Sequence, residues 1–510
     1  MGSFLGACWY AEMEPDLMVT HIIRFTRTAL YAVGIIYDYK KSFWHLSKTD
    51  PLYPSTQKEV NLRTANHLLA LCLKNKGIYV KAGQQIASMN HVLPKQFTDT
   101  LAVLQDKAEP TPFAKIEKTI LREYGKPSQE IFQEIDKEPI AAASLAQVHH
   151  AYLKDGRECA VKIQYPDMKN MFKADLFTIG WMVKLIAWSF PNFEFTWILP
   201  EFKKALEMEL DFKHEAQNAK RIAELFKQNK QIKIPEIYWE YSTNQILTME
   251  YIHACKINDT SCLDQNNINK HEAAALLMNC FSEQIFVHGF VHSDPHPGNL
   301  MVRKVDDKGK VIENAGEKKG LVQLVLLDHG LYKEIPEKMR IWYCKLWRGL
   351  VLRNNDDIEK YGRKLGCGDH SHLFALLLTF RPPTNKDIGL DQSLSEKDRK
   401  AIRAMFSSFE DALKLVTKLM KDLPSEMLFI LRTKNLLRSI NKELESNVNR
   451  FAIMARTSLA GIYKKGSQDS WWKKVRTWKI QIEFEAKLRF ALFLRYLIQN
   501  WWVPFLSYIQ

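Results

Sequence analysis

The chain has 510 residues, of which 46% are hydrophobic and 25% charged, and this ordinary globular composition excludes a disordered or collagen-like protein. The formal net charge of +14 favours anionic partners. Nucleic acid is not expected among them, because the chain has no run of five basic residues and no zinc-finger or RNA-binding aromatic motif. Its eight cysteines include no Cys-x-x-Cys pair, and we expect mostly reduced, buried thiols rather than a disulfide framework or a zinc site.

The first expected unit is 1–56. Acidic residues stand where a secretory signal would be basic, so no such signal is expected. The apolar stretch 17–37 is interrupted by Arg24 and Arg27, and its uncharged part is too short to span a bilayer. Two interpretations fit this stretch. It is either an amphipathic helix that targets an organelle or lies on a membrane, or simply the first packed helix.

The second expected unit is a helical extension, 57–135. Apolar residues recur every three or four positions across 57–105, which predicts helices, and Pro94 begins a new one. A further helix over 113–133 is expected to end near Gly125.

The pattern changes in the third expected unit, 136–252. Two runs that alternate or are rich in valine surround Asp155-Gly156, a turn signal that predicts a β-hairpin. The remaining elements expected here are the hairpin strands 146–152 and 158–164, helices over 169–190 and 201–227, and strands over 232–238 and 245–252. Together they predict a small sheet with a helix inserted after its third strand.

The fourth expected unit, 253–385, is mostly helical. Its exception is a pair of strands, 300–305 and 321–327, joined by a polar loop that we expect to be exposed. Helices are expected over 336–365 and 395–465. The last unit, 386–510, ends in a segment rich in tryptophan, lysine and arginine (471–510), which fits either a membrane interface or a helix docked on the fold.

The chemistry starts from His292-Ser-Asp-Pro-His-Pro-Gly-Asn299. Asp294 and Asn299 have the spacing of the kinase catalytic loop, in which the aspartate accepts the proton of the attacking hydroxyl and the asparagine binds Mg²⁺. An apolar strand is then followed by Asp328-His-Gly330, which is similar to the Asp-Phe-Gly motif of kinases. Oxygen ligands from Asn299 and Asp328 suit Mg²⁺.

Upstream, Cys159-Ala-Val-Lys162 matches the strand whose lysine contacts the phosphates in kinases. Glu215 is the expected carboxylate partner of this lysine. The three glycine positions of the kinase phosphate loop hold Ala141, Ala143 and Ala146, and alanine neither adopts positive φ freely nor lets a phosphate approach as closely. Ordinary protein-kinase geometry is therefore not expected.

A metal hydrolase is the alternative for this cluster, because His292 and His296 lie beside two aspartates. A zinc or di-iron site would not need Asn299 or Lys162. Each motif alone is weak, but their joint order favours the kinase-like interpretation.

These motifs resemble the UbiB family of atypical kinases, also called aarF-domain-containing kinases, over roughly residues 60–350. Lys81-Ala-Gly-Gln84 is similar to the family's Lys-x-Gly-Gln signature, and Glu209-x-Asp211 to its Glu-x-Asp motif. Ala141–Ser144 resembles its alanine-rich loop. Within the family the chain looks most like the subgroup typified by aarF-domain-containing kinase one. Ser293 stands where typical kinases have arginine, which argues against activation by loop phosphorylation.

The resemblance implies an α+β fold: an atypical protein-kinase-like two-lobed fold with an N-terminal helical extension and a C-terminal helical region. It implies the following site residues: catalytic Asp294, Lys162 and Glu215; nucleotide-binding Ala141, Ala142, Ala143, Ser144, Lys162, Glu250, Asn299 and Asp328; metal-binding Asn299 and Asp328; and an active-site cover of Lys81, Gln84, Glu209 and Asp211.

It also implies ATP or ADP with Mg²⁺ as cofactors, and an ATPase or kinase that is unlikely to phosphorylate proteins. The implied setting is a mitochondrial membrane with anionic lipid, in support of coenzyme Q or other lipid homeostasis. Two alternatives stay open. One is a small-molecule kinase, since the His-Pro-Gly-Asn ending resembles aminoglycoside and choline kinases. The other is a nucleotide-binding pseudokinase scaffold.

Overall fold

The computed structural model describes residues 15–47, 49–87, 93–105, 110–190, 198–312, 320–352, 354–379, 415, 418–419, 422–446, 448–462, 482, 485–486 and 489. The chain forms two compact units: unit 1 comprises Met1–Gln217 and Glu236–Tyr251, and unit 2 comprises Asn218–Pro235 and Ile252–Gln510. Residues 395–414, the first part of the helical stretch expected over 395–465, and nearly all of the tryptophan-rich end lie outside the described residues. No helix in the described ranges is long and apolar enough to cross a membrane.

Unit 1 contains an antiparallel sheet in the order β1-β3-β4-β6, with β2 paired to β3. Its strands are β1 (Phe132–Ile135), β2 (Ala141–Ala142), β3 (Ala146–Leu153), β4 (Glu158–Gln164) and β6 (Ile246–Glu250). The predicted β3–β4 hairpin is present, and Gly156 in its turn has φ +84°, a conformation that glycine adopts without strain. One face of the sheet buries Val161 and Ile163 against helix α6 (Phe113–Tyr124).

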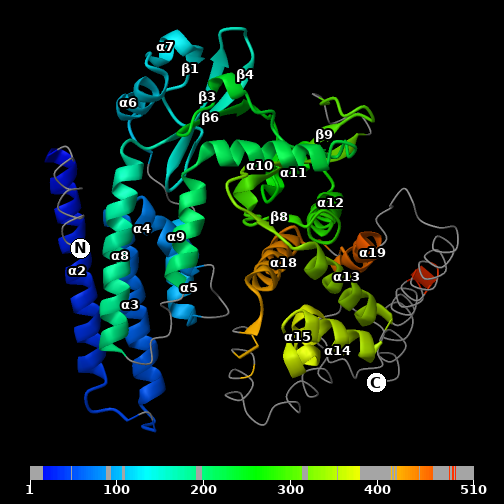
Figure 1. Ribbon diagram of the computed structural model, residues 1–510. Coiled ribbons are helices and arrows are strands. Elements are labelled where there is room, and N and C mark those ends of the chain that lie inside the picture. The colour runs from blue at the N-terminus through cyan, green and yellow to red at the C-terminus, as the bar shows by residue number, and fades with distance from the viewer. Residues whose placement is uncertain are drawn as a thin grey trace. The chain divides into compact units, whose positions relative to one another are not determined.

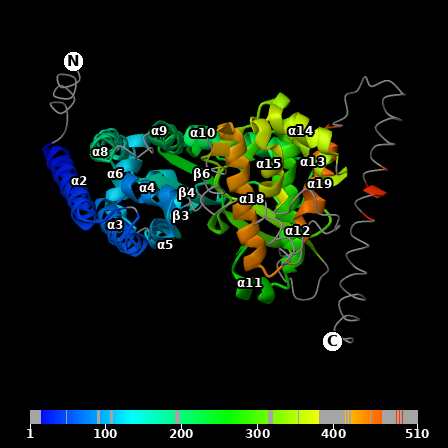
Figure 2. The same cartoon turned by 90° about the horizontal axis from the view of Figure 1, so that it is seen from below.

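The other helices of unit 1 surround this sheet or extend from it (Figure 1). They are α2 (Pro15–Ser42), α3 (Tyr53–Asn75), α4 (Ile78–Ala87), α5 (Lys95–Leu101), the 3₁₀ helix η1 (Ala102–Gln105), α7 (Ser128–Ile131), α8 (Met168–Ser189), α9 (Ile198–Glu209) and η2 (Trp239–Tyr241). Helix α10 (Phe212–Leu225) begins in unit 1 and continues into unit 2 after Gln217. Helix α6 ends, as predicted, at Gly125, which has φ +70°. Helices α2, α3 and α8 lie side by side in both ribbon views (Figures 1 and 2).

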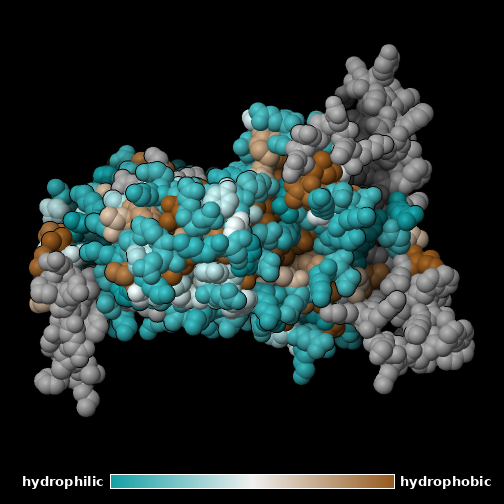
Figure 3. Space-filling model, turned by 90° about the horizontal axis from the view of Figure 1, so that it is seen from above, coloured by the Kyte–Doolittle hydropathy of each residue, from teal (hydrophilic) through white to brown (hydrophobic). Residues whose placement is uncertain are grey.

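The N-terminal stretch that the sequence left open is a packed helix in this structure. Helix α2 contacts both α3 and α8. Its outward side nevertheless carries apolar residues, and Figure 3 shows hydrophobic atoms at the left edge, where Figure 1 places α2.

Two predictions for this region were wrong. The expected helix 201–227 is broken between α9 and α10, because the Asp211 side chain accepts the backbone N–H groups of Lys213 and His214 and so starts a new helix. The expected strand 232–238 is only β5 (Ile232–Lys233), which pairs in parallel with β10 inside unit 2, a pairing between segments far apart in sequence. Further along, Ile237 forms an isolated bridge with Met249 of the small sheet.

Unit 2 holds a sheet in the order β5-β10-β9-β7 and a separate pair, β8 with β11. The strands are β7 (Cys255–Lys256), β8 (Phe290–His292), β9 (Leu300–Val305), β10 (Leu321–Leu326) and β11 (Tyr332–Glu334). The predicted hairpin of 300–305 with 321–327 is present as β9–β10.

Helices form the rest of the described part of unit 2. They are α11 (Thr260–Gln265), α12 (Lys270–Glu283), the π-turn η3 (Gln284–His288), η4 (Pro297–Asn299), α13 (Glu337–Leu352), α14 (Asn355–Lys364), η5 (Gly368–His370), α15 (Ser371–Thr379), α18 (Ser425–Glu443) and α19 (Arg450–Ile462). Their core includes fully buried Phe286, Tyr343 and Trp347. The helical pattern expected over 336–365 is present as α13 and α14, and Asn354 caps α14 by accepting the N–H of Asp357.

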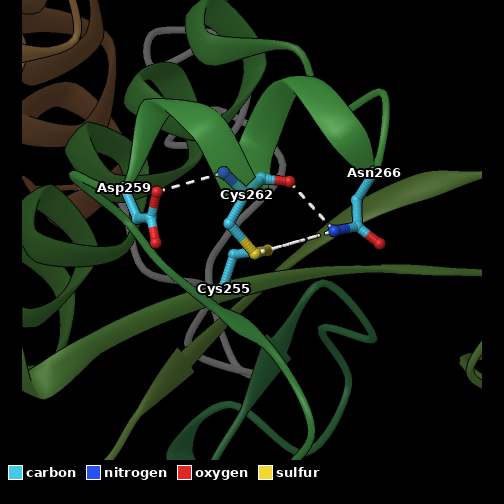
Figure 4. The surroundings of a disulfide bond; sticks show 4 residues. All are labelled: Cys255, Asp259, Cys262 and Asn266. Carbon is cyan, nitrogen blue, oxygen red and sulfur yellow. Dashed lines mark hydrogen bonds between the residues drawn. A yellow bond between two sulfur atoms is a disulfide. The ribbon is translucent and has the colours of Figure 1, made fainter.

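The prediction of reduced thiols fails for one cysteine pair. Cys255 of β7 and Cys262 of α11 form a disulfide, with their Cα atoms 5.7 Å apart (Figure 4). Asp259 caps α11 by accepting the N–H of Cys262, and Asn266 donates to the carbonyl of Cys262, so the helix holds this cysteine over β7. The other cysteines in the described residues are free and buried, as expected.

Candidate functional site

The predicted lysine–glutamate pair forms in unit 1. Lys162 lies on β4 between buried Val161 and Ile163, so its side chain points to the opposite face of the sheet. Its Nζ is 2.8 and 2.9 Å from the two carboxylate oxygens of Glu215, in the first turn of α10. The Glu215 side chain is only 2% exposed and that of Lys162 15%. The pair therefore holds the ammonium in one position at the edge of the protein interior.

The start of α10 is fixed by hydrogen bonds from its neighbours. Asp211 accepts from the N–H groups of Lys213 at 3.1 Å and His214 at 3.2 Å. Gln164, two residues beyond Lys162, donates to the Leu210 carbonyl at 2.9 Å. Asp211 thus orients the helix that carries Glu215. Its expected part in an active-site cover stays a prediction.

The Lys-x-Gly-Gln helix, α4, is tied down at two places. Lys81 Nζ is 2.8 Å from a carboxylate oxygen of Glu209, at the end of α9. Gln84 instead donates to the Leu104 carbonyl of η1 at 2.9 Å. Between them, a Cβ on Gly83 would lie 2.3 Å from Leu104 Cδ1, so glycine lets α4 pack closely on η1. The expected cover residues Lys81 and Glu209 therefore meet, whereas Gln84 serves the packing of the helix.

The alanine-rich loop is a closed turn. Ala141 and Ala142 pair with β3, and Ala143 donates its N–H to the Ala146 carbonyl at 2.8 Å. The non-glycine residues with positive φ in the described chain do not include any in this turn, so its alanines adopt the backbone without strain. Leu145 at its tip is buried in one apolar cluster with Ile78 of α4 and with α9. The loop, α4 and α9 thus form one packed assembly.

Glu250 ends β6, where the chain leaves the sheet. Its carboxylate accepts the backbone N–H of Glu236 at 3.0 Å, and its own N–H donates to the Glu236 carbonyl at 2.8 Å. These bonds fix the end of the strand. The role of Glu250 in nucleotide binding stays a prediction.

In unit 2, the β9–β10 hairpin brings two motifs to the same end. Leu300 pairs with Leu326, and the N–H of Leu327 donates to the Asn299 carbonyl at 3.0 Å. Asn299 and Asp328 therefore stand at neighbouring positions just beyond the paired strands. The Asn299 amide donates weakly, at 3.4 Å, to the carbonyl of Asp294. Asp294, Asn299 and Asp328 are all only partly buried, so a ligand can reach them.

A buried histidine joins the motifs. His292 Nδ1 accepts the N–H of Asp294 at 3.1 Å, and His292 Nε2 lies 2.5 Å from the Asp328 carbonyl, to which it must donate. One ring nitrogen accepts and the other donates, so the ring is neutral. Burial lowers the pKa of His292 from its ordinary 6.5, which agrees with this state. Sequence reasoning included His292 in the motif but missed this positioning role, although a histidine two residues before the aspartate was the available signal.

Asp328 is also held from its C-terminal side. Its Oδ1 accepts the N–H of Gly330 at 2.9 Å. The ring of buried His329 lies within hydrogen-bonding distance of the Tyr332 hydroxyl and of the Leu326 carbonyl, and Asn218 donates to the His329 carbonyl. The Asp-x-Gly turn is thus fixed by bonds to its backbone and rings.

These residues suit a hard cation rather than a zinc cage. Within the described ranges, no group of three or more histidine, cysteine, aspartate or glutamate residues is placed to hold a metal ion. Asn299 and Asp328 supply two oxygen-bearing side chains at adjacent positions, which is the protein share of an Mg²⁺ site completed by phosphate and water. The metal-hydrolase alternative gains no support from this part of the chain.

Known proteins share these features. Residues 103–362 match the family described as the ABC1 atypical kinase-like domain. AarF domain-containing protein kinase 1 of Gallus gallus is 36% identical over 475 residues, which cover 92% of this chain and 89% of that protein. Probable serine/threonine-protein kinase abkD of Dictyostelium discoideum is 41% identical over 465 residues, which cover 90% of this chain but only 65% of that longer protein.

A solved structure shares the fold. The complex of Rv3197 with erythromycin from Mycobacterium tuberculosis aligns with a TM-score of 0.51 and 23% identity, covering 78% of this chain and 97% of that one. The predicted fold class is confirmed: the chain has an α+β, kinase-like two-lobed fold with helices added at both ends.

Proposed function

Because the chain belongs to the ABC1 family of atypical kinases, whose members include the AarF domain-containing protein kinases, we propose that it binds ATP with Mg²⁺ and acts as an atypical kinase or ATPase. The observation that carries this proposal is the two-contact ion pair of Lys162 with buried Glu215. A lysine held in this way by a glutamate is the phosphate-contacting element of kinases.

The remaining residues have separate roles in this proposal. Asn299 and Asp328 hold the metal, which when bound offsets the negative charge of the phosphates. Asp294 accepts the proton of the attacking hydroxyl or water. Its partly buried position and the His292 bond to its backbone support this role.

The acceptor is proposed to be water or a small, lipid-related alcohol rather than a protein. In support, the alanine loop is a closed turn packed on α4, the helix that carries Lys81. By resemblance to the family, the proposed setting is a mitochondrial membrane with anionic lipid, where the protein supports coenzyme Q or other lipid homeostasis.

Nucleotide binding and turnover test the core of this proposal. Lys162→Ala should weaken MgATP binding and abolish turnover. Lys137→Ala is the matched control, because Lys137 is an exposed lysine of the same unit. Equal MgATP affinity and equal turnover in both variants would show that Lys162 is not part of the ATP site.

Vesicles test the lipid-linked part. Cardiolipin-rich vesicles should raise ATP turnover above the rate with neutral vesicles. In a second experiment, mass spectrometry of the lipid extracted from purified Asp294→Asn protein should identify a candidate acceptor. Equal rates with both kinds of vesicle would favour a soluble small-molecule kinase instead.

If Asp294→Asn restores cells that lack the protein as well as the intact chain does, the pseudokinase scaffold is the better account.

A further inference from the structure

Helix α2 carries an apolar stripe on its water-facing side. Its outward residues Val19, Ile23, Leu30, Val33 and Tyr37 follow helical spacing, and each is at least half exposed, with Leu30 reaching 70%. At 1.5 Å per residue this stripe is about 27 Å long. A water-facing stripe of this kind is uncommon on a soluble protein and marks an interaction surface.

The inward side of α2 buries Ala32 and Ile35 together with a polar network, and this network fixes the helix in its orientation. Arg24 is buried and forms a two-contact ion pair with Asp175 of α8, in which Nε to Oδ1 is 2.9 Å. One turn further, Thr28 and the Tyr79 hydroxyl are 2.9 Å apart, and Asn75 donates to Thr28 at 3.2 Å. Rotating α2 to hide its apolar stripe would break this network and leave a buried charge unpaired, so the stripe stays outside.

Helix α8 continues the same surface. Its exposed residues Phe177, Trp181 and Trp188 lie on one side of the helix, and exposed Lys173 and Lys184 alternate with them. The ring of Phe25, at the side of α2, lies 6.0 Å from that of Trp181, so the exposed residues of α8 begin where α8 contacts α2. We call these outward sides of α2 and α8 the α2–α8 face.

Charge and aromatic residues on the α2–α8 face fit an anionic lipid surface. Residues 17–37 contain no aspartate or glutamate, and Asp38, just beyond them, is paired with Arg63 of α3. Asp175, the single acid of α8, is buried. The stripe of α2 ends at exposed Lys40 and Lys41, close in sequence to Trp44, which is 76% exposed. Tryptophan beside lysine around an apolar band is the composition of protein surfaces at the membrane–water interface.

We propose that the α2–α8 face docks on the surface of an anionic lipid bilayer, with its apolar side chains below the headgroups and its lysines at the lipid phosphates. A second copy of this chain fits less well, because pairing two such faces would bring their lysines together without acidic partners. The proposal deepens the lipid-linked part of the proposed function and rests on it for the kind of partner. Docking itself needs neither ATP nor Asp294.

Vesicle flotation without nucleotide tests the docking, with the full chain, also as Asp294→Asn so that catalysis plays no part. Vesicles of phosphatidylcholine with 20–30% cardiolipin are compared with vesicles of pure phosphatidylcholine. The cardiolipin content is chosen to give roughly the negative surface charge at which each lysine strengthens binding about fivefold. Lys173→Glu/Lys184→Glu should weaken binding to the anionic vesicles by more than about tenfold. Lys115→Glu/Lys118→Glu, on exposed positions of α6, is the matched control and should bind like the wild type.

Insertion is read separately with an environment-sensitive fluorophore on Leu30→Cys and, as control, on Leu121→Cys, an exposed apolar position of α6. Anionic vesicles should shift the emission of the label at position 30 to the blue and leave that at 121 unchanged. Circular dichroism and thermal unfolding of each variant check that it is folded.

Three results would overturn the docking proposal. Equal vesicle binding by the two charge-reversal pairs would show that the α2–α8 face is not used. A blue-shifted label at position 30 before vesicles are added would show that another part of the chain covers it. A dimer in light scattering that Leu30→Ser dissociates would show that the occupant is a second copy. Vesicle binding by an intact chain that does not turn over ATP would instead count against the proposed catalytic function alone.

Discussion

The Lys162–Glu215 pair allows stability and activity to be separated. Because Glu215 is 2% exposed, Lys162→Met would leave a buried carboxylate without its cation, at a cost of about 3–5 kcal/mol. The double variant Lys162→Met/Glu215→Leu replaces both charges with apolar groups and should recover most of that loss, since exchanging a buried ion pair for packed apolar residues is often neutral. Neither variant should turn over ATP.

Amide hydrogen exchange is the suitable assay, because a chain with two compact units need not unfold in one step. Protection of the β4 and α10 amides should fall roughly 10²- to 10⁴-fold in Lys162→Met and return to within about tenfold of wild type in the double variant. Lys137→Met should match wild type in both protection and turnover. A double variant as unprotected as Lys162→Met, or one that keeps ATP turnover, would refute this reasoning.

Three further predictions concern separate parts of the chain. Burial lowers the pKa of His292 in the folded state, so the unfolded chain takes up a proton below about pH 6.5 that the folded chain does not, and stability should fall as the pH drops from 7.5 to 5. The thermal midpoint of His292→Gln should fall less over that range, and an equal fall would contradict the assignment. Ala143→Gly should loosen the alanine turn and change the ratio of ATP to ADP affinity, measured by calorimetry, and an unchanged ratio would count against the turn as the selectivity element. The disulfide closes a short loop, because its cysteines are seven positions apart, so Cys262→Ser should destabilise the α11 region by about 2.5 kcal/mol in hydrogen exchange. Alkylation of all eight cysteines in unfolded, unreduced protein would show that the bond does not form.

Local signals in the sequence predicted much of the fold. Asp155-Gly156 located the β3–β4 hairpin, and Gly125 located the end of α6. The break before α10 also had a local signal in Asp211, an N-cap residue that helical periodicity on both sides concealed. The place of β5 had none, because its strand partner, β10, comes much later in the chain.

In the candidate site too, some contacts could be predicted from the sequence and others could not. The order of the motifs predicted the pairing of Lys162 with Glu215 and the approach of Asn299 to Asp328, since a hairpin must bring its ends together. The outward-facing stripe of α2 could not be predicted, because it depends on an ion pair with Asp175, 151 positions away. The partner of Gln84 was also missed, since it is a backbone carbonyl rather than a motif residue.

The rate of ATP turnover by Asp294→Asn tests the proposed catalytic site most directly. Its control is Asp307→Asn, on an exposed aspartate of the same unit. Loss of the base should lower the rate of phosphate release or transfer by about 10²- to 10⁴-fold while MgATP still binds, and Asp307→Asn should turn over ATP like the intact chain. Equal turnover by Asp294→Asn and the intact chain would contradict the catalytic role of this loop.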